Sequence, residues 1–191
     1  KLDINMSDNS LEQVSSTKYL GVHIDNMMKW DIHVQNVCRN VSAKLATLNR
    51  VRQFLSKEVL AMIYCTSILP SIDYACSVWG NCSDFNKNMI YRLQKRAARI
   101  VTGNFDYINT RGSDLMAELK WQTFYQRRNY FLSMLMFKCI HGLAPYWLSN
   151  EVLMACEAHD RDTRLSSGMD VMIPKPNRES FRNSFKYQSA Y

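Results

Sequence analysis

The sequence lacks several features that would assign it at once to a familiar class. A membrane-spanning helix needs a run of about 18 apolar residues, and polar residues break every apolar run of this sequence well before that length. The first ten residues are polar and show no signal-peptide pattern. The six glycines are isolated, which excludes a glycine-rich phosphate loop. We therefore expect an intracellular protein, nuclear or cytoplasmic, without a membrane partner.

The chain also lacks a recognisable metal centre or nucleophilic site. Its six cysteines have no paired spacing, so reduced thiols in apolar surroundings are expected. Cys139-x-His141 and Cys156-x-x-His159 contain ligand types for zinc, but their spacing matches no common zinc signature. None of the four histidines has a Ser or Cys partner at the spacing of a known triad. No cofactor is expected in this chain.

What is present is a globular composition with an excess of positive charge. Apolar residues make up 47% of 191 residues, enough to build a sizeable core. The 24 basic and 17 acidic residues give a net charge of +7. This balance favours nucleic acid or another anionic surface as the partner.

Helical spacing of apolar residues dominates the chain. Helices are predicted to start at Asp31, at Ser56, and at Ser83 or Asp84, where side-chain oxygens cap backbone N–H groups. A break is expected at Pro70, and Gly103 is a C-terminal stop. Further helices are predicted over residues 113–119, 123–141 and 145–156. The helix over 123–141 is apolar nearly all round, which predicts that it is the most buried in a bundle.

The N-terminal quarter contains strand patterns. Residues 19–25 alternate between apolar and other residues with period two, which predicts one strand with Gly21 in its middle. Leu2, Ile4 and Met6 alternate in the same way, and residues 11–14 could return as a second strand. The predicted fold is therefore mainly α, a helical bundle with a small antiparallel β-sheet at the N-terminus.

Several short sequence motifs resemble, in their order along the chain, those of one family. The motifs are Lys18-Tyr19-Leu20-Gly21-Val22-x-Ile24-Asp25 followed by Trp30, Ile68-Leu69-Pro70, Leu93-Gln94-Lys95-Arg96-Ala97-Ala98-Arg99-Ile100, His141-Gly142-Leu143-Ala144-Pro145 and Arg182-Asn183-Ser184-Phe185. Together they resemble the region after the catalytic palm in reverse transcriptases of non-LTR, LINE-type, jockey-like retrotransposons.

The resemblance implies a division of the chain and a set of partners. Residues 1–25 would be the last strands of the palm, including a primer-grip-like strand, and 26–103 a thumb-like helical region. Residues 104–157 would be a C-terminal helical extension, and 158–191 a largely irregular tail. The implied partners are an RNA/DNA duplex and the palm and fingers of the same polyprotein. Lys1 is not an initiator Met, so we expect a fragment of a longer protein.

The resemblance also predicts that this chain does not polymerise DNA alone. RNA-directed DNA polymerases of this kind need paired aspartates to hold two metal ions. No Asp-Asp pair occurs in the sequence, so the pair and its Mg²⁺ are expected in a palm upstream of residue 1.

A basic helix face is the main candidate site. Arg92, Lys95, Arg96 and Arg99 recur at i, i+3, i+4 and i+7, and no acidic residue lies between Asn86 and Asn104. This stripe is predicted to contact the phosphates of a template–primer duplex, although a solvated helix face would show the same pattern. The candidate nucleic-acid-binding residues are Lys18, Tyr19, Gly21, Arg39, Arg50, Arg92, Lys95, Arg96 and Arg99. The alternative function is a helical protein–protein interaction module, a decayed or domesticated retroelement remnant.

Overall fold

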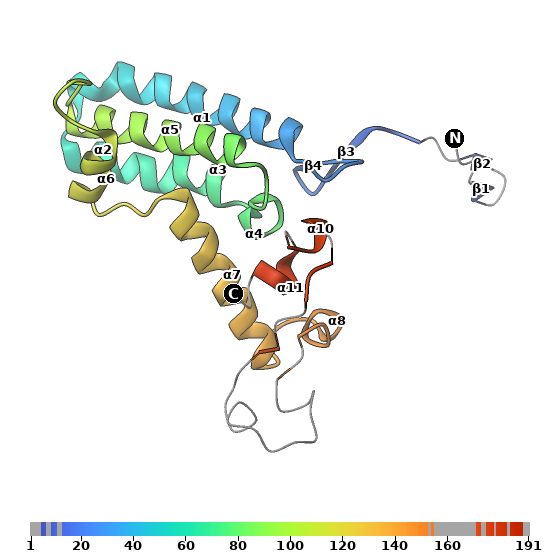
Figure 1. Cartoon of the computed structure of the whole chain (residues 1–191). Coiled ribbons are helices and arrows are strands. Elements are labelled where there is room, and N and C mark those ends of the chain that lie inside the picture. Colours follow the sequence, from blue (N-terminus) through green and yellow to red (C-terminus); the bar gives the residue numbers. More distant parts are fainter. Residues whose placement is uncertain are drawn as a thin grey trace. The chain divides into compact units, whose positions relative to one another are not determined.

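A computed structural model describes the chain at residues 5–6, 9–10, 13–152, 154, 171–172, 175–177, 179–182 and 184–188. The protein is mainly helical with a small antiparallel sheet near the N-terminus, as predicted (Figure 1). It divides into two compact units. The first unit comprises residues 1–75 and 82–119, and the second comprises residues 76–81 and 120–191.

The predicted single strand over residues 19–25 is wrong, because the chain reverses inside it. β3 (Ser16–Tyr19) pairs antiparallel with β4 (Val22–Asp25), and Tyr19 lies opposite Val22. Leu20 and Gly21 form the two-residue turn, with φ of 46° and 85°. Positive φ at both positions is typical of the tightest hairpins and normally selects Asn-Gly. The leucine concealed the turn, because its apolar side chain continues the strand alternation.

One N-terminal sheet was expected, but the structure has two separate two-stranded sheets among the described residues. β1 (Asn5–Met6) pairs with β2 (Asn9–Ser10) in a separate two-stranded sheet. The predicted return strand over residues 11–14 lies partly outside the described residues, and residues 13–14 are not in a strand.

The carboxylate of Asp25 organises the connection between the hairpin and the first long helix. It accepts backbone N–H groups of Met27, Lys29 and Trp30 at 3.0, 3.1 and 2.8 Å. Partial burial would raise the pKa of Asp25, but these backbone donors outweigh it and hold the pKa below its ordinary value of 3.8. The helix starts at Asp31 as predicted, but its N-cap is Trp30, in a left-handed conformation, and Asp31 does not serve as the predicted capping residue.

Asp25→Asn is expected to lower the free energy of unfolding at neutral pH by about 1 kcal/mol, because it removes a charged acceptor of three N–H groups. The folded pKa of Asp25 is depressed, so its contribution is complete above 3.8 and disappears as pH falls through the lower folded value. The difference between the wild type and the variant should therefore shrink in acid. Urea unfolding at neutral and at acid pH measures it, and a difference that stays constant would contradict this role.

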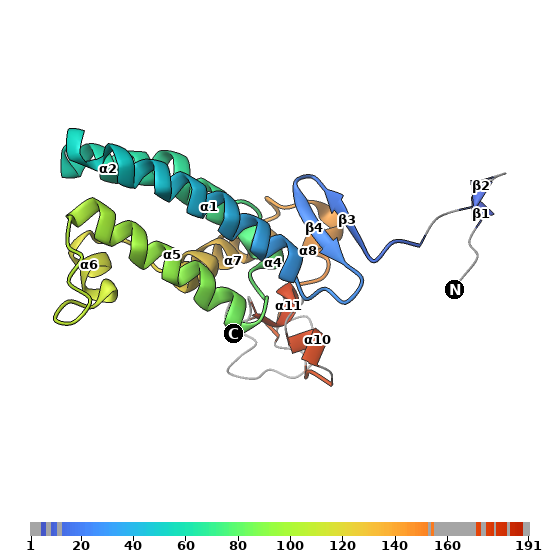
Figure 2. The same cartoon turned by 90° about the horizontal axis from the view of Figure 1, so that it is seen from above.

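Three helical segments form the core of the first unit. α1 (Asp31–Val51) packs on α5 (Asp84–Thr102), and both contact the segment that runs from α2 to α3 (Figures 1 and 2). The side chains that α1 buries fall on one stripe: His33, Val34, Val41, Leu45 and Leu48. Asp31 accepts a hydrogen bond from Asn86 at 2.7 Å, which ties the starts of α1 and α5 together.

The predicted capping residues of the first unit are confirmed at Ser56 and Ser83. Ser56 begins α2 (Lys57–Ile63) and Ser83 begins α5, each accepting the N–H group three residues on. Gly103 ends α5 in a left-handed conformation, with φ of 69°. A short 3₁₀ turn, η1 (Arg52–Phe54), connects α1 to α2.

Pro70 interrupts the second helical segment, as predicted. α2 continues into a π-helical turn, η2 (Tyr64–Ile68), and α3 (Leu69–Asp73) restarts with Pro70 in its first turn. Lys44 of α1 donates to the Ser67 carbonyl and the Ser71 hydroxyl, both at 2.7 Å. Lys44 of α1 therefore supplies hydrogen bonds where the π-helical turn η2 passes into α3.

α6 (Gly112–Glu118) completes the first unit against α5. The sequence predicted its start at Ser113, within one residue of the observed start. Glu118 pairs with Lys57 at 2.6 Å, which connects α6 to the first residue of α2. Both side chains are about half exposed, so this pair adds little to stability.

The second unit contains α4 (Cys76–Trp79) and α7 (Phe124–Ile140). Thr123 and Gln126 form the predicted capping box at the start of α7. The Trp79 ring stacks on Phe124 with centroids 5.3 Å apart.

The prediction that α7 is the most buried helix is wrong. Its buried residues lie on one stripe, Phe124, Arg128, Leu132, Met136 and Cys139, whereas α5 buries more of its surface. Tyr130 and Phe137 are more than half exposed. Apolar composition on every side of a helix does not require a packing partner on every side.

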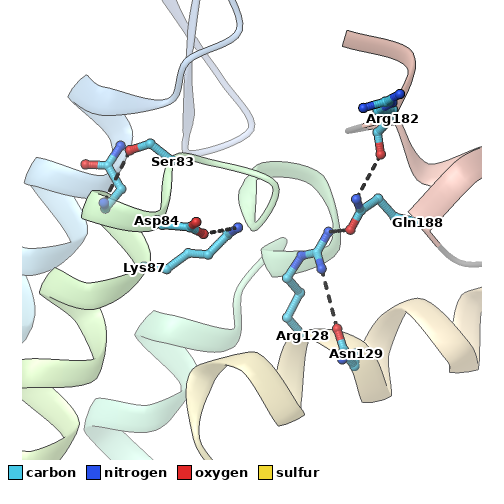
Figure 3. Close-up of polar contacts among 8 residues, drawn as sticks. Ser83, Asp84, Lys87, Arg128, Asn129, Arg182 and Gln188 are labelled. Atoms are coloured by element: carbon cyan, nitrogen blue, oxygen red, sulfur yellow. Dashed lines mark hydrogen bonds and ion pairs between the residues drawn. The ribbon is translucent and has the colours of Figure 1, made fainter. Parts of the chain in front are cut away.

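Short helices follow α7 in the second unit. α8 (Tyr146–Ser149) begins after Pro145 but ends well before the predicted residue 156. α10 (Glu179–Arg182) and α11 (Phe185–Gln188) form within the tail over residues 158–191 that was predicted to be largely irregular. Arg128, only 8% exposed, donates to Gln188 and Asn129 at 3.0 and 3.4 Å (Figure 3).

Candidate nucleic-acid interface

The predicted basic stripe lies on the outer side of α5. Arg92, Lys95, Arg96 and Arg99 all line one cavity of about 300 Å³, together with Tyr107 and Gly112. Arg92 and Arg96 are exposed and one turn apart. Helical periodicity thus brings these four basic residues to one place, and α6 with its preceding loop forms the opposite wall.

Lys95 is held partly along the protein surface. Its Nζ lies 4.5 Å from the centre of the Tyr91 ring, in cation–π geometry. The aliphatic part of its side chain packs against the start of α6. A Cβ atom added to Gly112 would lie only 2.8 Å from the Lys95 Cβ, which is too close for two carbon atoms. The absent side chain at position 112 therefore allows α6 to approach the stripe.

Arg99 differs from the other three residues of the stripe. It is 6% exposed, and its guanidinium donates to the carbonyls of Asn104, Asp106 and Thr110 at 3.4, 2.9 and 2.7 Å. A guanidinium used in this way organises the protein's own backbone. The spacing could not separate Arg99 from its neighbours, because the loop that covers it lies after the helix.

The loop that Arg99 holds is further tied by its own side chains. Asp106 accepts the N–H groups of Ile108 and Asn109 at 2.9 Å, and Asn104 accepts the N–H of Asp106 at 2.9 Å. The pKa of Asp106 lies below its ordinary value because its carboxylate accepts hydrogen bonds. The largest effect comes from the Asn109 backbone, followed in size by the Asn109 side chain and the Ile108 backbone. The loop therefore has a defined conformation although it lies at the surface.

A second cavity lies where the hairpin meets α1 and α3. It has a volume of about 490 Å³ and includes the predicted Lys18 and Gly21 in its lining. The Tyr74 hydroxyl donates to the Leu20 carbonyl at 2.6 Å, which fixes the hairpin turn against the end of α3. Tyr19, 65% exposed, is not among the residues that line this cavity.

His33 forms part of the wall of this second cavity. Its Nδ1 accepts the backbone N–H of His23 at 3.3 Å, which requires an unprotonated nitrogen. Burial is the larger of two causes that lower the pKa of His33, and the electrostatic interaction with His23 is the smaller. The ring is therefore neutral at physiological pH and serves to hold β4 against α1.

Arg39 and Arg50 remain on the exposed side of α1. Arg39 donates to Asn36 at 3.2 Å, and neither arginine is among the residues that line the two cavities. The structure thus brings Arg92, Lys95 and Arg96 together but leaves these two predicted residues apart from them.

Tyr107, Lys44 and Tyr74 were missed by the sequence analysis. Tyr107 follows the predicted end of the helix, so no helical period connects it to the stripe. Lys44 lies on α1, far from Pro70 in sequence, and Pro70 alone indicated that nearby backbone groups such as the Ser67 carbonyl would need another partner. Tyr74 lies shortly after Pro70, but nothing in its own segment indicated a contact with the distant Leu20.

Two further properties bear on the possible chemistry. Within the part of the chain that the structure describes, no three His, Cys, Asp or Glu side chains gather in a way that could hold a metal ion. Cys156 and His159 lie outside that part. None of the described helices is long and apolar enough to cross a membrane.

Comparison with known proteins points to mobile-element polymerases. The chain is 30% identical over 120 residues to a probable RNA-directed DNA polymerase from the transposon X-element of Drosophila melanogaster. It is 28% identical over 117 residues to the probable enzyme from transposon BS of the same species, and 26% identical over 120 residues to that from the mobile element jockey of Drosophila funebris. These matches cover 61%, 59% and 61% of this chain. No family model and no solved structure matches it.

The chain is therefore homologous to RNA-directed DNA polymerases of Drosophila non-LTR retrotransposons, which confirms the resemblance found in its sequence. The match spans only 13% of the length of each of these relatives.

Proposed function

We propose that this chain is the part of a retrotransposon reverse transcriptase that follows the palm and grips the RNA/DNA template–primer duplex by its phosphates. Its thumb-like region would hold the duplex, while palm and fingers of the same polyprotein would supply the Mg²⁺ and the paired aspartates. By itself the chain would be non-catalytic, because it contains no Asp-Asp pair.

The observation that carries this proposal is the charge arrangement on α5. Arg92 and Arg96 are exposed beside Lys95, and α5 has no acidic residue after Asp84, whose carboxylate accepts a hydrogen bond from Lys87 (Figure 3). Exposed guanidinium groups in a row are suited to phosphate oxygens, which accept from Arg in a forked geometry. Contacts of this kind fix the position of a duplex without reading its sequence.

A salt titration tests the proposal. Wild-type affinity for an RNA/DNA duplex should fall steeply with salt, because each phosphate contact releases counterions. Replacing Arg92, Lys95 and Arg96 together by Gln should reduce the log–log salt slope by up to about 3 units. Arg99 is kept, because its guanidinium supports the loop. Fluorescence anisotropy of a labelled duplex over a range of salt measures the slope.

A matched control removes the same charge elsewhere. Lys138, Lys175 and Arg182 are exposed residues of the second unit, and their joint replacement by Gln also removes three positive charges. This control should keep the wild-type slope. Equal losses in both variants would mean that net charge alone attracts the duplex, and the assignment to α5 would fail.

The alternative of a protein-interaction module has its own support in the second unit. Leu143, Tyr146 and Trp147 are all exposed, and they cluster within five residues of sequence. An absence of duplex binding at low salt would favour this alternative over the phosphate-binding proposal.

A further inference from the structure

The tip of the loop between α5 and α6 carries two large side chains that the protein leaves in solvent. Tyr107 is 71% exposed and Ile108 is 94% exposed. Figure 2 shows where this connection lies, between the end of α5 and α6. An aromatic and an aliphatic side chain are therefore exposed together at a loop tip whose Tyr107 also lines the basic cavity.

One face of the Tyr107 ring is covered by another side chain of the protein. The Arg99 guanidinium carbon lies 4.2 Å from the centre of the Tyr107 ring, so the cation covers one face. Since the residue is nevertheless largely exposed, the other face is open to a ligand. Tyr107 also lines the cavity of Arg92, Lys95 and Arg96.

We propose that Tyr107 is a stacking platform for an unpaired nucleotide base whose flanking phosphates lie on Arg92, Lys95 and Arg96. This proposal rests on the proposed nucleic-acid binding and adds the kind of nucleotide that the site accepts. Bases inside a duplex are stacked on both faces, whereas an unpaired base has a free face to offer to an aromatic ring. Combined cationic and aromatic surfaces of this kind bind single strands with little sequence preference.

The surrounding hydrogen bonds favour binding because they order the platform in advance. Arg99 donates to three loop carbonyls, and Asp106 accepts two N–H groups from the turn that follows it. A ring held on an ordered loop loses little conformational freedom when a base stacks on it. Ile108 lies next to it and offers apolar surface to the same nucleotide or its sugar.

The test compares three probes: a short oligothymidylate strand, an abasic strand with the same number of phosphates, and an RNA/DNA duplex. The wild type should bind oligothymidylate about 5- to 150-fold more tightly than the abasic strand, the range expected for stacking one base. Tyr107→Ala should abolish this preference and leave affinity for the abasic strand unchanged. Tyr107→Trp should retain it, because the ring is preserved.

The control is Tyr146→Ala, which removes another exposed tyrosine, 79% exposed in the second unit, and should keep the preference. Equal wild-type affinity for the base-bearing and abasic strands would overturn the stacking proposal, even if duplex binding stayed intact. A preference that survives in Tyr107→Ala would also overturn it. Failure to bind any of the three probes at low salt would instead refute the proposed function and leave a protein as the partner of this tip.

Discussion

Leu45→Ala is expected to lower the free energy of unfolding by about 2–5 kcal/mol. Leu45 is fully buried on α1, in the stripe that packs in the core of the first unit. Truncating a buried leucine loses its transfer free energy and leaves a cavity that the surrounding helices fill only in part. Urea unfolding followed by far-UV circular dichroism measures the loss.

The comparison variant is Leu135→Ala on α7. Sequence alone would give both leucines the same cost, because α7 was predicted to be the most buried helix. In the structure Leu135 is only partly buried, so its truncation should cost less, about 1 kcal/mol. A Leu135→Ala loss as large as that of Leu45→Ala would restore the prediction of a central α7.

Arg99→Gln is expected to destabilise the protein by about 2–3 kcal/mol, because it removes a charged donor that serves three loop carbonyls. Arg96→Gln removes the same charge from an exposed position and should stay within about 0.5 kcal/mol of the wild type. Unfolding in urea measures both values. Hydrogen exchange at residues 104–110 should increase only in the Arg99 variant, because its loop loses its anchor.

The two variants should show the reverse order in duplex binding. Arg96→Gln should reduce the salt slope by up to about 1 unit, since that side chain is free to contact a phosphate. Arg99→Gln should leave the slope unchanged at temperatures where it remains folded. If Arg99→Gln reduced the slope and Arg96→Gln did not, the structural role assigned to Arg99 would be wrong.

The sequence by itself determined several helix ends and the resemblance to mobile-element polymerases. Ser56, Ser83, Thr123 with Gln126, and Gly103 mark helix ends through hydrogen bonds and backbone preferences that act within a few residues. Such local effects can be read without knowing the fold. The periodicity of Arg92, Lys95 and Arg96 is equally local, and it placed three of the candidate basic residues correctly on one side of α5.

Only the tertiary structure decided which of these residues are available to a ligand. Arg99 and Arg96 are three residues apart on the same helix, yet a loop that returns over the helix covers only Arg99. The same return brings Tyr107 to the basic cavity. The Leu20-Gly21 turn depends in the same way on Tyr74, which is distant in sequence. Burial and hydrogen bonding between distant segments are set by packing, and the pattern of a single segment contains no information about what will cover it.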